Sequence, residues 1–306
     1  MRIGLGLAAL GRPGYLTLGH GDDLGRSRSV AALERRAHAV LDAAYDAGIR
    51  HFDAARSYGR AEQFLASWLE RRGITPGDAI VASKWGYTYT AAWRVRADPP
   101  EVKNLSASTF RRQLGETRSL LGPWLSLYQI HSATVSSGVL DDEVLRSELA
   151  ALRSGGTAVG LTVTGTEQAA TIERALEVGG FDTVQATWNL HERSAGAALA
   201  RARAAGVRVV IKEAVANGRL ADRGAPEPLA GVARRLGTTP DAVAVAAVLA
   251  QPWADAVLSG AATTEQVRAN LASLEVRWDD AVARELEGLA EPADRYWATR
   301  AALPWN

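Results

Sequence analysis

Four side chains that can transfer or orient protons follow neighbouring apolar segments of this sequence. Asp53, Lys84 and His131 each end a segment typical of a buried strand, and Tyr58 lies five residues beyond Asp53. In a barrel of parallel strands the C-terminal strand ends converge on one mouth, so these groups would meet there. A phenol beside an ammonium, a carboxylate and an imidazole suits proton transfer to an alkoxide that forms from a carbonyl group.

Each of these residues, taken singly, also has a purely structural interpretation. Asp53 would cap a turn, Tyr58 would lie at the surface, and His131 would be hydrogen-bonded at a strand end. Lys84 is harder to explain in this way because a buried ammonium needs a carboxylate partner, and Asp53 is the nearest candidate in sequence. The pKa of a free phenol is about 10, so we expect the Lys84 cation to lower the pKa of Tyr58.

The composition limits the kinds of partner and cofactor. The chain has 306 residues, of which 47% are hydrophobic and 23% charged, with a formal net charge of +1 and no cysteine. Disulfides, thiolate chemistry and cysteine-type metal sites are therefore excluded, and no metal centre is expected. The balanced charge predicts a small-molecule ligand rather than nucleic acid or a membrane surface. No apolar run reaches the roughly 20 residues that span a bilayer, and we expect a cytoplasmic protein.

Apolar periodicity and turn signals predict eight strands that alternate with helices. Regular alternation implies parallel strands with right-handed crossovers, and eight uninterrupted units favour a closed (β/α)8 TIM barrel. We expect one domain over 1–306, in which 274–306 form a C-terminal extension over the barrel with a helix near 279–291 and an irregular aromatic tail. After a first glycine-rich strand, the expected strands are 49–53, 79–84, 125–131, 157–161, 182–187, 207–211 and 255–259. The expected helices are 29–47, 60–72, 107–121, 141–154, 166–178, 193–205, 227–236, 240–250 and 264–273.

An ordered set of motifs resembles the aldo-keto reductases, in particular the bacterial members. The segment 51–62, His-Phe-Asp-Ala-Ala-Arg-Ser-Tyr-Gly-Arg-Ala-Glu, is similar to the signature of that family around its aspartate and tyrosine. Ser83-Lys84 and Gln129-Ile130-His131 stand where the family has the other two members of its catalytic tetrad. Further matches run along nearly the whole chain, at Gly160-Leu161-Thr162, Gln185 with Asn189, Gly218-Arg219-Leu220, and Ser259-Gly260-Ala261 with Gln266 and Asn270.

The resemblance implies an oxidoreductase that transfers hydride between NADP(H) or NAD(H) and a carbonyl or alcohol substrate. It implies that Tyr58 is the general acid in reduction, that Lys84 and Asp53 tune it, and that His131 orients the carbonyl. It also implies a set of cofactor-binding residues: Thr162 and Gln185 at the carboxamide, Lys212, Gly218 and Leu220 along the pyrophosphate, and Gly260, Gln266, Arg268 and Asn270 at the adenosine end.

The chain departs from the pattern of the family at three places, the first of which is Val163, where the family often has an asparagine that binds the carboxamide. Lys212 stands where many members stack a tyrosine on the nicotinamide, and Trp188 is the alternative stacking residue. The positions that often bind the 2′-phosphate through Lys or Arg are Gly260 and Gln266, which leaves Arg268 as the nearby cation. We therefore expect NADP(H) to be preferred over NAD(H), but only by a modest margin.

Aromatic residues near the expected mouth predict how the substrate binds. Trp85 and Tyr87 follow Lys84 on a loop of about 20 residues, Trp188 follows a later strand, and Trp297 lies in the tail. These side chains either pack the loops onto the barrel or form the walls of a site for an apolar or ring-shaped substrate.

Two other functions stay open at this stage. A lysine at a barrel mouth beside a carboxylate also describes a Schiff-base aldolase that would use Lys84. A barrel that binds a nicotinamide cofactor would also suit a redox-sensing subunit of a larger complex. Tyr58 and His131 have no evident role in the first alternative, and an intact tetrad argues against the second.

Overall fold

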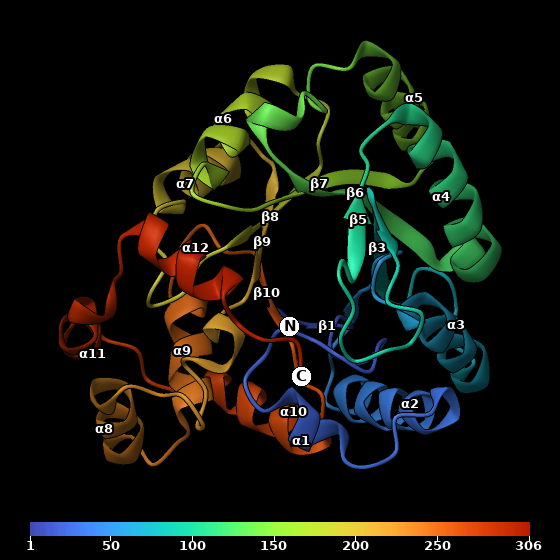
Figure 1. Cartoon of the computed structure of the whole chain (residues 1–306). Coiled ribbons are helices and arrows are strands. Elements are labelled where there is room, and N and C mark those ends of the chain that lie inside the picture. The colour runs from blue at the N-terminus through green and yellow to red at the C-terminus, as the bar shows by residue number, and fades with distance from the viewer.

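The computed structural model describes residues 1–306 and contains a closed barrel of eight parallel strands surrounded by helices (Figure 1). The order around the barrel is β1-β10-β9-β8-β7-β6-β3-β2, with β1 paired to both β2 and β10. This arrangement confirms the predicted (β/α)8 fold. The barrel strands are β1 Ile3–Gly6, β2 His51–Asp53, β3 Ile80–Trp85, β6 Leu125–Ala133, β7 Ala158–Val163, β8 Thr183–Thr187, β9 Arg208–Lys212 and β10 Ala256–Ser259.

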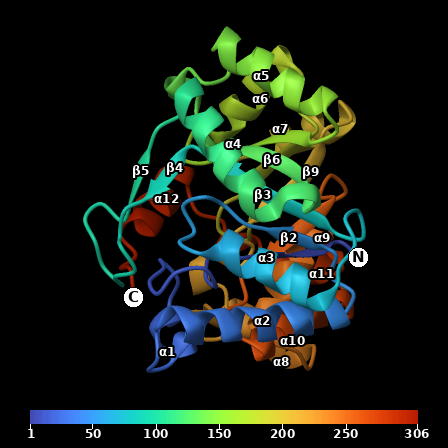
Figure 2. The ribbon, with the colours of Figure 1, turned by 90° about the vertical axis from the view of Figure 1, so that its right-hand side faces the viewer.

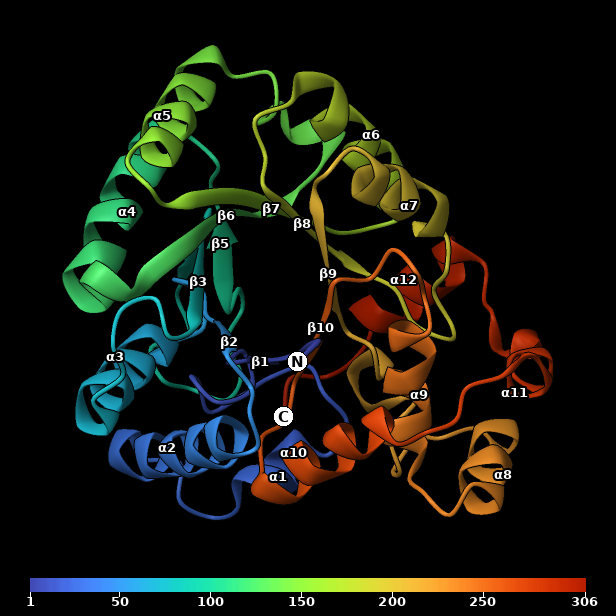
Figure 3. The same cartoon turned by 180° about the vertical axis from the view of Figure 1, so that it is seen from behind.

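The helices form the outer layer, and helix α2, Val30–Asp46, follows Ser29, where the predicted helix 29–47 begins. Ser29 accepts a hydrogen bond from the amide of Ala32, and the apolar stripe of α2 is buried as its spacing predicts. Figure 3 shows the same ring of helices from behind. The helices are α1 His20–Leu24, α2 Val30–Asp46, α3 Ala61–Arg72, α4 Ala107–Leu121, α5 Glu143–Ser154, α6 Gln168–Val178, α7 Gly196–Ala204, α8 Glu227–Arg235, α9 Pro240–Leu249, α10 Thr264–Leu271, α11 Asp280–Glu285 and α12 Ala293–Ala301. None of them is both long and apolar enough to cross a membrane.

The segment after β3, expected to be a plain loop, contains a small hairpin. Strands β4, Tyr87–Tyr89, and β5, Glu101–Lys103, pair antiparallel, and both stand clear of the barrel at one edge of its mouth (Figure 2). The two strands are only three residues long, too short for the sequence pattern to show. Their pairing brings Glu101 into the cavity at the mouth of the barrel.

The C-terminal region differs from the expectation in two ways. The predicted helix over 279–291 stops at Glu285 and continues only as a 3₁₀ turn over Glu287–Leu289, which contains the flexible Gly288. The predicted irregular tail instead forms α12, which begins after Pro292 and has Arg300 in its last turn, as helix signals predict. Helix α12 packs on the barrel near β9 (Figure 1), where Tyr296 accepts a hydrogen bond of 3.0 Å from Asn189.

Four buried histidines predict how stability depends on pH. Burial lowers the pKa of His20 and of His51 to about 4, and it also lowers the pKa of His131 and His191. The folded protein therefore keeps these imidazoles neutral, while the unfolded chain binds protons below about pH 6.5. We expect the melting temperature, measured by circular dichroism at constant ionic strength, to fall steadily as the pH is lowered from 7 toward 4. A melting temperature that does not change between pH 7 and pH 5 would show that the buried histidines do not determine how stability depends on pH.

Candidate active site

The predicted catalytic side chains meet at the C-terminal ends of the barrel strands. Asp53, Tyr58 and His131 line a cavity of about 250 Å³ at this mouth. Lys84 lies directly beneath, with 1% of its surface exposed, and its Nζ is 4.9 Å from the centre of the Tyr58 ring. The rings of Tyr58 and His131 meet edge to face at 5.5 Å.

The Lys84 ammonium and the Asp53 carboxylate form a buried ion pair. Lys84 also donates to the carbonyl of Ala54 at 3.0 Å, and Asp53 accepts from the amide of Gln129 at 3.0 Å and of Gln185 at 3.4 Å. The adjoining strands thus satisfy both charges, as burial requires. The pair that the sequence predicted is present, and its position leaves Lys84 without access to the cavity.

Two glycines allow the loop after β1 to approach the loop that carries Tyr58. Gly59 has φ +60° and its backbone lies against the carbonyl of Gly11, so a side chain at either glycine would collide with the other loop. The amide of Arg60 donates to the carbonyl of Gly11 at 2.7 Å. This close approach carries Arg12 to the side of Tyr58.

Arg12 is a residue of the site that the sequence analysis missed. Its guanidinium is almost fully buried, forms an ion pair of 3.0 Å with Glu101, and donates to the carbonyl of Ser57. It lies 5.2 Å from the centre of the Tyr58 ring and is also enclosed by the rings of Tyr15 and Trp305. Arg12 therefore places a second cation beside the candidate acid.

Burial dominates the protonation of the catalytic groups. It raises the pKa of Tyr58, with the Asp53 carboxylate adding to the rise and Arg12 opposing it. The prediction that the Lys84 cation would lower the pKa of Tyr58 is therefore wrong, because the loss of solvation on burial outweighs the effect of the nearby cations. Burial, followed by the charges of Lys84 and Lys212, lowers the pKa of His131. At neutral pH the site holds a protonated phenol and a neutral imidazole, which suit an acid and a hydrogen-bond donor.

The end of β9 contributes a second charged cluster. Glu213 accepts from Arg300 of α12 through Nε at 2.9 Å and through Nη2 at 2.5 Å. Burial alone would raise the pKa of Glu213, but Arg300 and Lys212 lower it to about 2. Lys212 donates to the hydroxyl of Thr187 at 2.8 Å, and burial lowers its pKa to about 8. All three charged side chains line the cavity, so helix α12 forms part of its wall.

A second cavity, of about 380 Å³, continues from the first toward α10. The two share five lining residues, Ala9, Thr17, Val215, Gly260 and Asn270. Of the predicted cofactor residues, Thr162, Gln185 and Lys212 line only the first cavity, and Gly218 and Gln266 line only the second. Together the cavities form an elongated groove that starts at Tyr58, and most of the predicted cofactor residues lie along it.

Several predicted residues do not line this groove. Trp85 follows the inward-facing Lys84 on β3, so it points outward and packs on Phe110 of α4. The ring of Trp188 packs on that of Trp253 at 5.6 Å. Three further predicted residues also lie outside the groove: Leu220 is in the core, Trp297 is beside Lys212, and Arg268 is exposed. Of the four aromatic residues predicted to bind substrate, only Tyr87 lines the cavity at the mouth.

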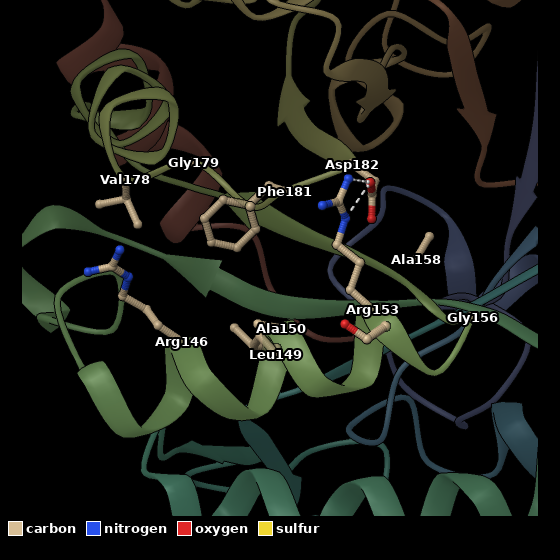
Figure 4. Close-up of a pocket in the computed structure, with 12 residues that line it drawn as sticks. Arg146, Leu149, Ala150, Arg153, Gly156, Ala158, Val178, Gly179, Phe181 and Asp182 are labelled. Atoms are coloured by element: carbon tan, nitrogen blue, oxygen red, sulfur yellow. Dashed lines mark hydrogen bonds and ion pairs between the residues drawn. The ribbon is translucent and has the colours of Figure 1, made fainter.

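Another hollow, of about 660 Å³, lies at the opposite, N-terminal ends of the strands, between α5 and the segment before β8 (Figure 4). Arg153 and Asp182 form an ion pair across it, and Phe181 closes one side. None of the predicted site residues is part of it. No group of three or more His, Asp or Glu side chains gathers as a metal site would require.

Comparison with known proteins identifies the family. The model of the Aldo/keto reductase family matches residues 2–291. The chain belongs to this family. It is an NAD(P)H-dependent oxidoreductase, and the family acts on small carbonyl substrates with a nicotinamide cofactor.

Two known proteins resemble the chain at modest sequence identity. The chain is 25% identical to the uncharacterized oxidoreductase YrpG of Bacillus subtilis over 84% of this chain and 87% of that protein. It is 35% identical to the aldo-keto reductase str7 of Strobilurus tenacellus, over 35% of this chain but only 27% of str7.

Solved structures share the fold of this aldo-keto reductase. The aldo-keto reductase AKR11C1 of Bacillus halodurans, in its holo form, is 20% identical and has a TM-score of 0.70 over 95% of this chain and 93% of its own. The glycerol dehydrogenase AKR11B4 of Gluconobacter oxydans is 21% identical, also with a TM-score of 0.70, over 94% of this chain and 90% of its own. At these identities the likeness concerns the fold alone.

Proposed function

We propose that this aldo-keto reductase transfers hydride between a nicotinamide dinucleotide and a carbonyl or alcohol substrate, with Tyr58 as general acid in reduction and general base in oxidation. One observation carries the proposal. Tyr58 and His131 line a cavity above the buried Lys84–Asp53 pair, and that cavity shares lining residues with a second one, so that the two form an elongated groove.

The residues along the groove fit a dinucleotide. A Cβ atom at Gly260 would meet only open space, so the groove is unobstructed where the two cavities join. Two residues that line the first cavity have a buried polar atom without a hydrogen-bond partner, namely the side-chain oxygen of Asn217 and Nδ1 of His131. Polar atoms without partners in a groove of this kind are suited to a polar ligand. Thr162, Gln185, Lys212, Gly260 and Asn270 would hold the cofactor.

The nicotinamide, when bound, supplies or accepts the hydride. Tyr58 lines the cavity, where its hydroxyl would give its proton to a substrate oxygen. His131, as a neutral imidazole beside Tyr58, would donate a hydrogen bond to the same oxygen and fix its position. When Tyr58 gives up its proton, Lys84 and Arg12 stabilise the phenolate through their charges.

Tyr87 and Tyr15 complete the wall of the cavity around the reacting group. The ring of Tyr87 meets the imidazole of His131 at 4.9 Å, and the guanidinium of Arg12 lies 4.9 Å from the centre of the Tyr15 ring. These rings suit the apolar part of a small carbonyl substrate.

The decisive experiment is titration of the purified protein with NADH and NADPH without oxygen, followed by a panel of aldehydes, ketones and sugars. Binding with consumption of the reduced cofactor supports the function, and binding without any turnover would favour the redox-sensing alternative.

A chemical trapping experiment separates this function from the Schiff-base aldolase. Lys84 is 1% exposed and its ammonium is paired with Asp53, so it cannot attack a carbonyl group as a free amine. We expect no reduced adduct on Lys84 after incubation with a carbonyl substrate and borohydride, as measured by peptide mass spectrometry. An adduct on Lys84 would support the aldolase instead. An adduct on Lys212, which does line the cavity, would show only that the reagents had entered.

A further inference from the structure

The second cavity receives the adenosine half of the cofactor if the proposed function holds. Hydride transfer requires the nicotinamide ring to lie next to Tyr58 and His131, in the first cavity. The rest of an extended dinucleotide must then follow the shared wall at Gly260 and Asn270 into the second cavity. The side chains there therefore face the ribose whose 2′ position carries a hydroxyl in NAD(H) and a phosphate in NADP(H).

The charge of this second cavity is mostly negative. It is lined by four carboxyl groups and one guanidinium, those of Asp23, Asp222, Asp241, Glu265 and Arg223. The guanidinium is already engaged, because it pairs with Asp23 at 2.7 Å and donates to the carbonyl of Gly19 at 2.7 Å. Burial raises the pKa of Asp241, and the charge of Asp222 adds to the rise, while hydrogen bonds from backbone amides oppose it. A phosphate that carries almost two negative charges would meet net repulsion here.

Neither Gln266 nor Arg268, both predicted to lie at the adenosine end, offers a free donor to this cavity. The side-chain amide of Gln266 accepts from the backbone of Ala262 at 2.7 Å and donates to Asp23 at 2.8 Å, so both of its ends are used. Arg268 does not line the cavity, its side chain is 75% exposed, and its nearest acid is Glu265 at 3.8 Å.

The start of helix α10 is also satisfied by the protein itself. The N-terminus of a helix attracts anions through its free amides and its dipole. Here Thr263 caps the amide of Gln266, and Glu265 stands in the first turn, where its own backbone amide and the neighbouring hydroxyls lower its pKa. A phosphate would have to displace or face this carboxylate.

We propose that the second cavity selects NAD(H) over NADP(H), the reverse of the order expected from the sequence. Carboxylates accept hydrogen bonds from the two hydroxyls of an unmodified ribose, whereas they repel a 2′-phosphate. Asp23 and Glu265 set this preference. Gln266 contributes because its hydrogen bond to Asp23 keeps its side-chain amide from the ligand. The inference rests on the proposed function only in assuming that a nicotinamide dinucleotide binds in the groove.

Binding constants test the proposal without any need for turnover. The dissociation constants of NADH and NADPH are measured by calorimetry on the full chain, at low and at physiological ionic strength. We expect NADH to bind more tightly by about tenfold or more, equivalent to about 1.4 kcal/mol. We also expect added salt to narrow the difference, because repulsion between the phosphate and the exposed carboxylates is screened.

Two single variants and a matched control assign the preference to residues. Glu265→Gln should tighten NADPH by about threefold to tenfold and weaken NADH, because it removes a negative charge at the 2′ position and replaces a charged hydrogen-bond acceptor of the ribose by a neutral amide. Gln266→Arg should tighten NADPH by a similar factor and leave NADH nearly unchanged, because it adds a positive charge there. Glu143→Gln is the control, since Glu143 also lies in the first turn of its helix but does not line the groove.

The outcomes separate this inference from the function on which it rests. NADPH that binds as tightly as NADH, or more tightly, overturns the selection of NAD(H) and leaves the proposed function intact. An unchanged NADPH constant in both variants overturns the assignment to the second cavity. A protein that binds neither dinucleotide overturns the proposed function itself, and the inference with it.

Discussion

Replacement of Tyr58 by phenylalanine should lower the rate of carbonyl reduction by about 10² to 10⁴. The substitution removes only the hydroxyl and so leaves the substrate oxygen without its proton donor. The ring, and with it the contacts to His131, Arg12 and Lys84, is kept. Cofactor binding should therefore stay within about threefold of the parent protein, because the loss is confined to the transition state. Steady-state kinetics and a dissociation constant on the same sample provide both values.

Tyr45→Phe is the matched control for Tyr58→Phe. Tyr45 loses the same hydroxyl but lies on α2, where its ring packs on Trp68 outside the barrel. Its kinetics should not change. If Tyr58→Phe retains turnover within about threefold of the parent, another group donates the proton and the assignment of Tyr58 is wrong.

Asp53→Asn should destabilise the protein by about 3 to 5 kcal/mol, because it leaves the Lys84 ammonium buried without a counter-charge. For a chain of 306 residues this corresponds to a decrease of roughly 5 to 8 °C in the melting temperature. Reduction should also slow, since the substitution disturbs the position of Lys84 below Tyr58. Thermal and urea unfolding, with kinetics on the folded fraction, measure the two effects separately.

The double variant Asp53→Asn with Lys84→Met distinguishes a structural pair from a catalytic one. Removing both charges should recover most of the lost stability, because no unpaired charge remains in the barrel. Turnover should not recover, because the cation beneath Tyr58 is gone. If the double variant is as active as the parent, the pair serves only the fold. If Asp53→Asn alone is as stable as the parent within about 1 kcal/mol, the ammonium has found another partner.

The sequence predicts well those features that depend on local periodicity. The apolar stripe of α2, its cap at Ser29, and the strand ends at Asp53 and Lys84 all follow from neighbours within a few residues. The closed barrel follows from the number of βα units and from the absence of a break between them. The meeting of Asp53, Tyr58, Lys84 and His131 at one mouth is then a consequence of parallel strands.

Features that depend on contacts between distant segments could not be predicted from the sequence. Arg12 lies in an irregular turn, and only the close approach of Gly11 to Gly59 places it beside Tyr58. Arg300 reaches Glu213 across 87 positions, and the sequence shows neither partner as part of the site. The pKa of Tyr58 was predicted in the wrong direction because charge is visible in a sequence and the extent of burial is not.

The pairing of the first barrel strand with the last affects how the chain emerges from the ribosome. Ile3 pairs with Val257, so one edge of β1 has no partner until about 250 further residues have been synthesised. At typical rates of translation this interval is roughly 10 to 50 s. During that time β2 covers only the other edge of β1. Nascent chains that end before β10 therefore present an open parallel edge to which foreign strands can add, and they are the forms that chaperones should capture.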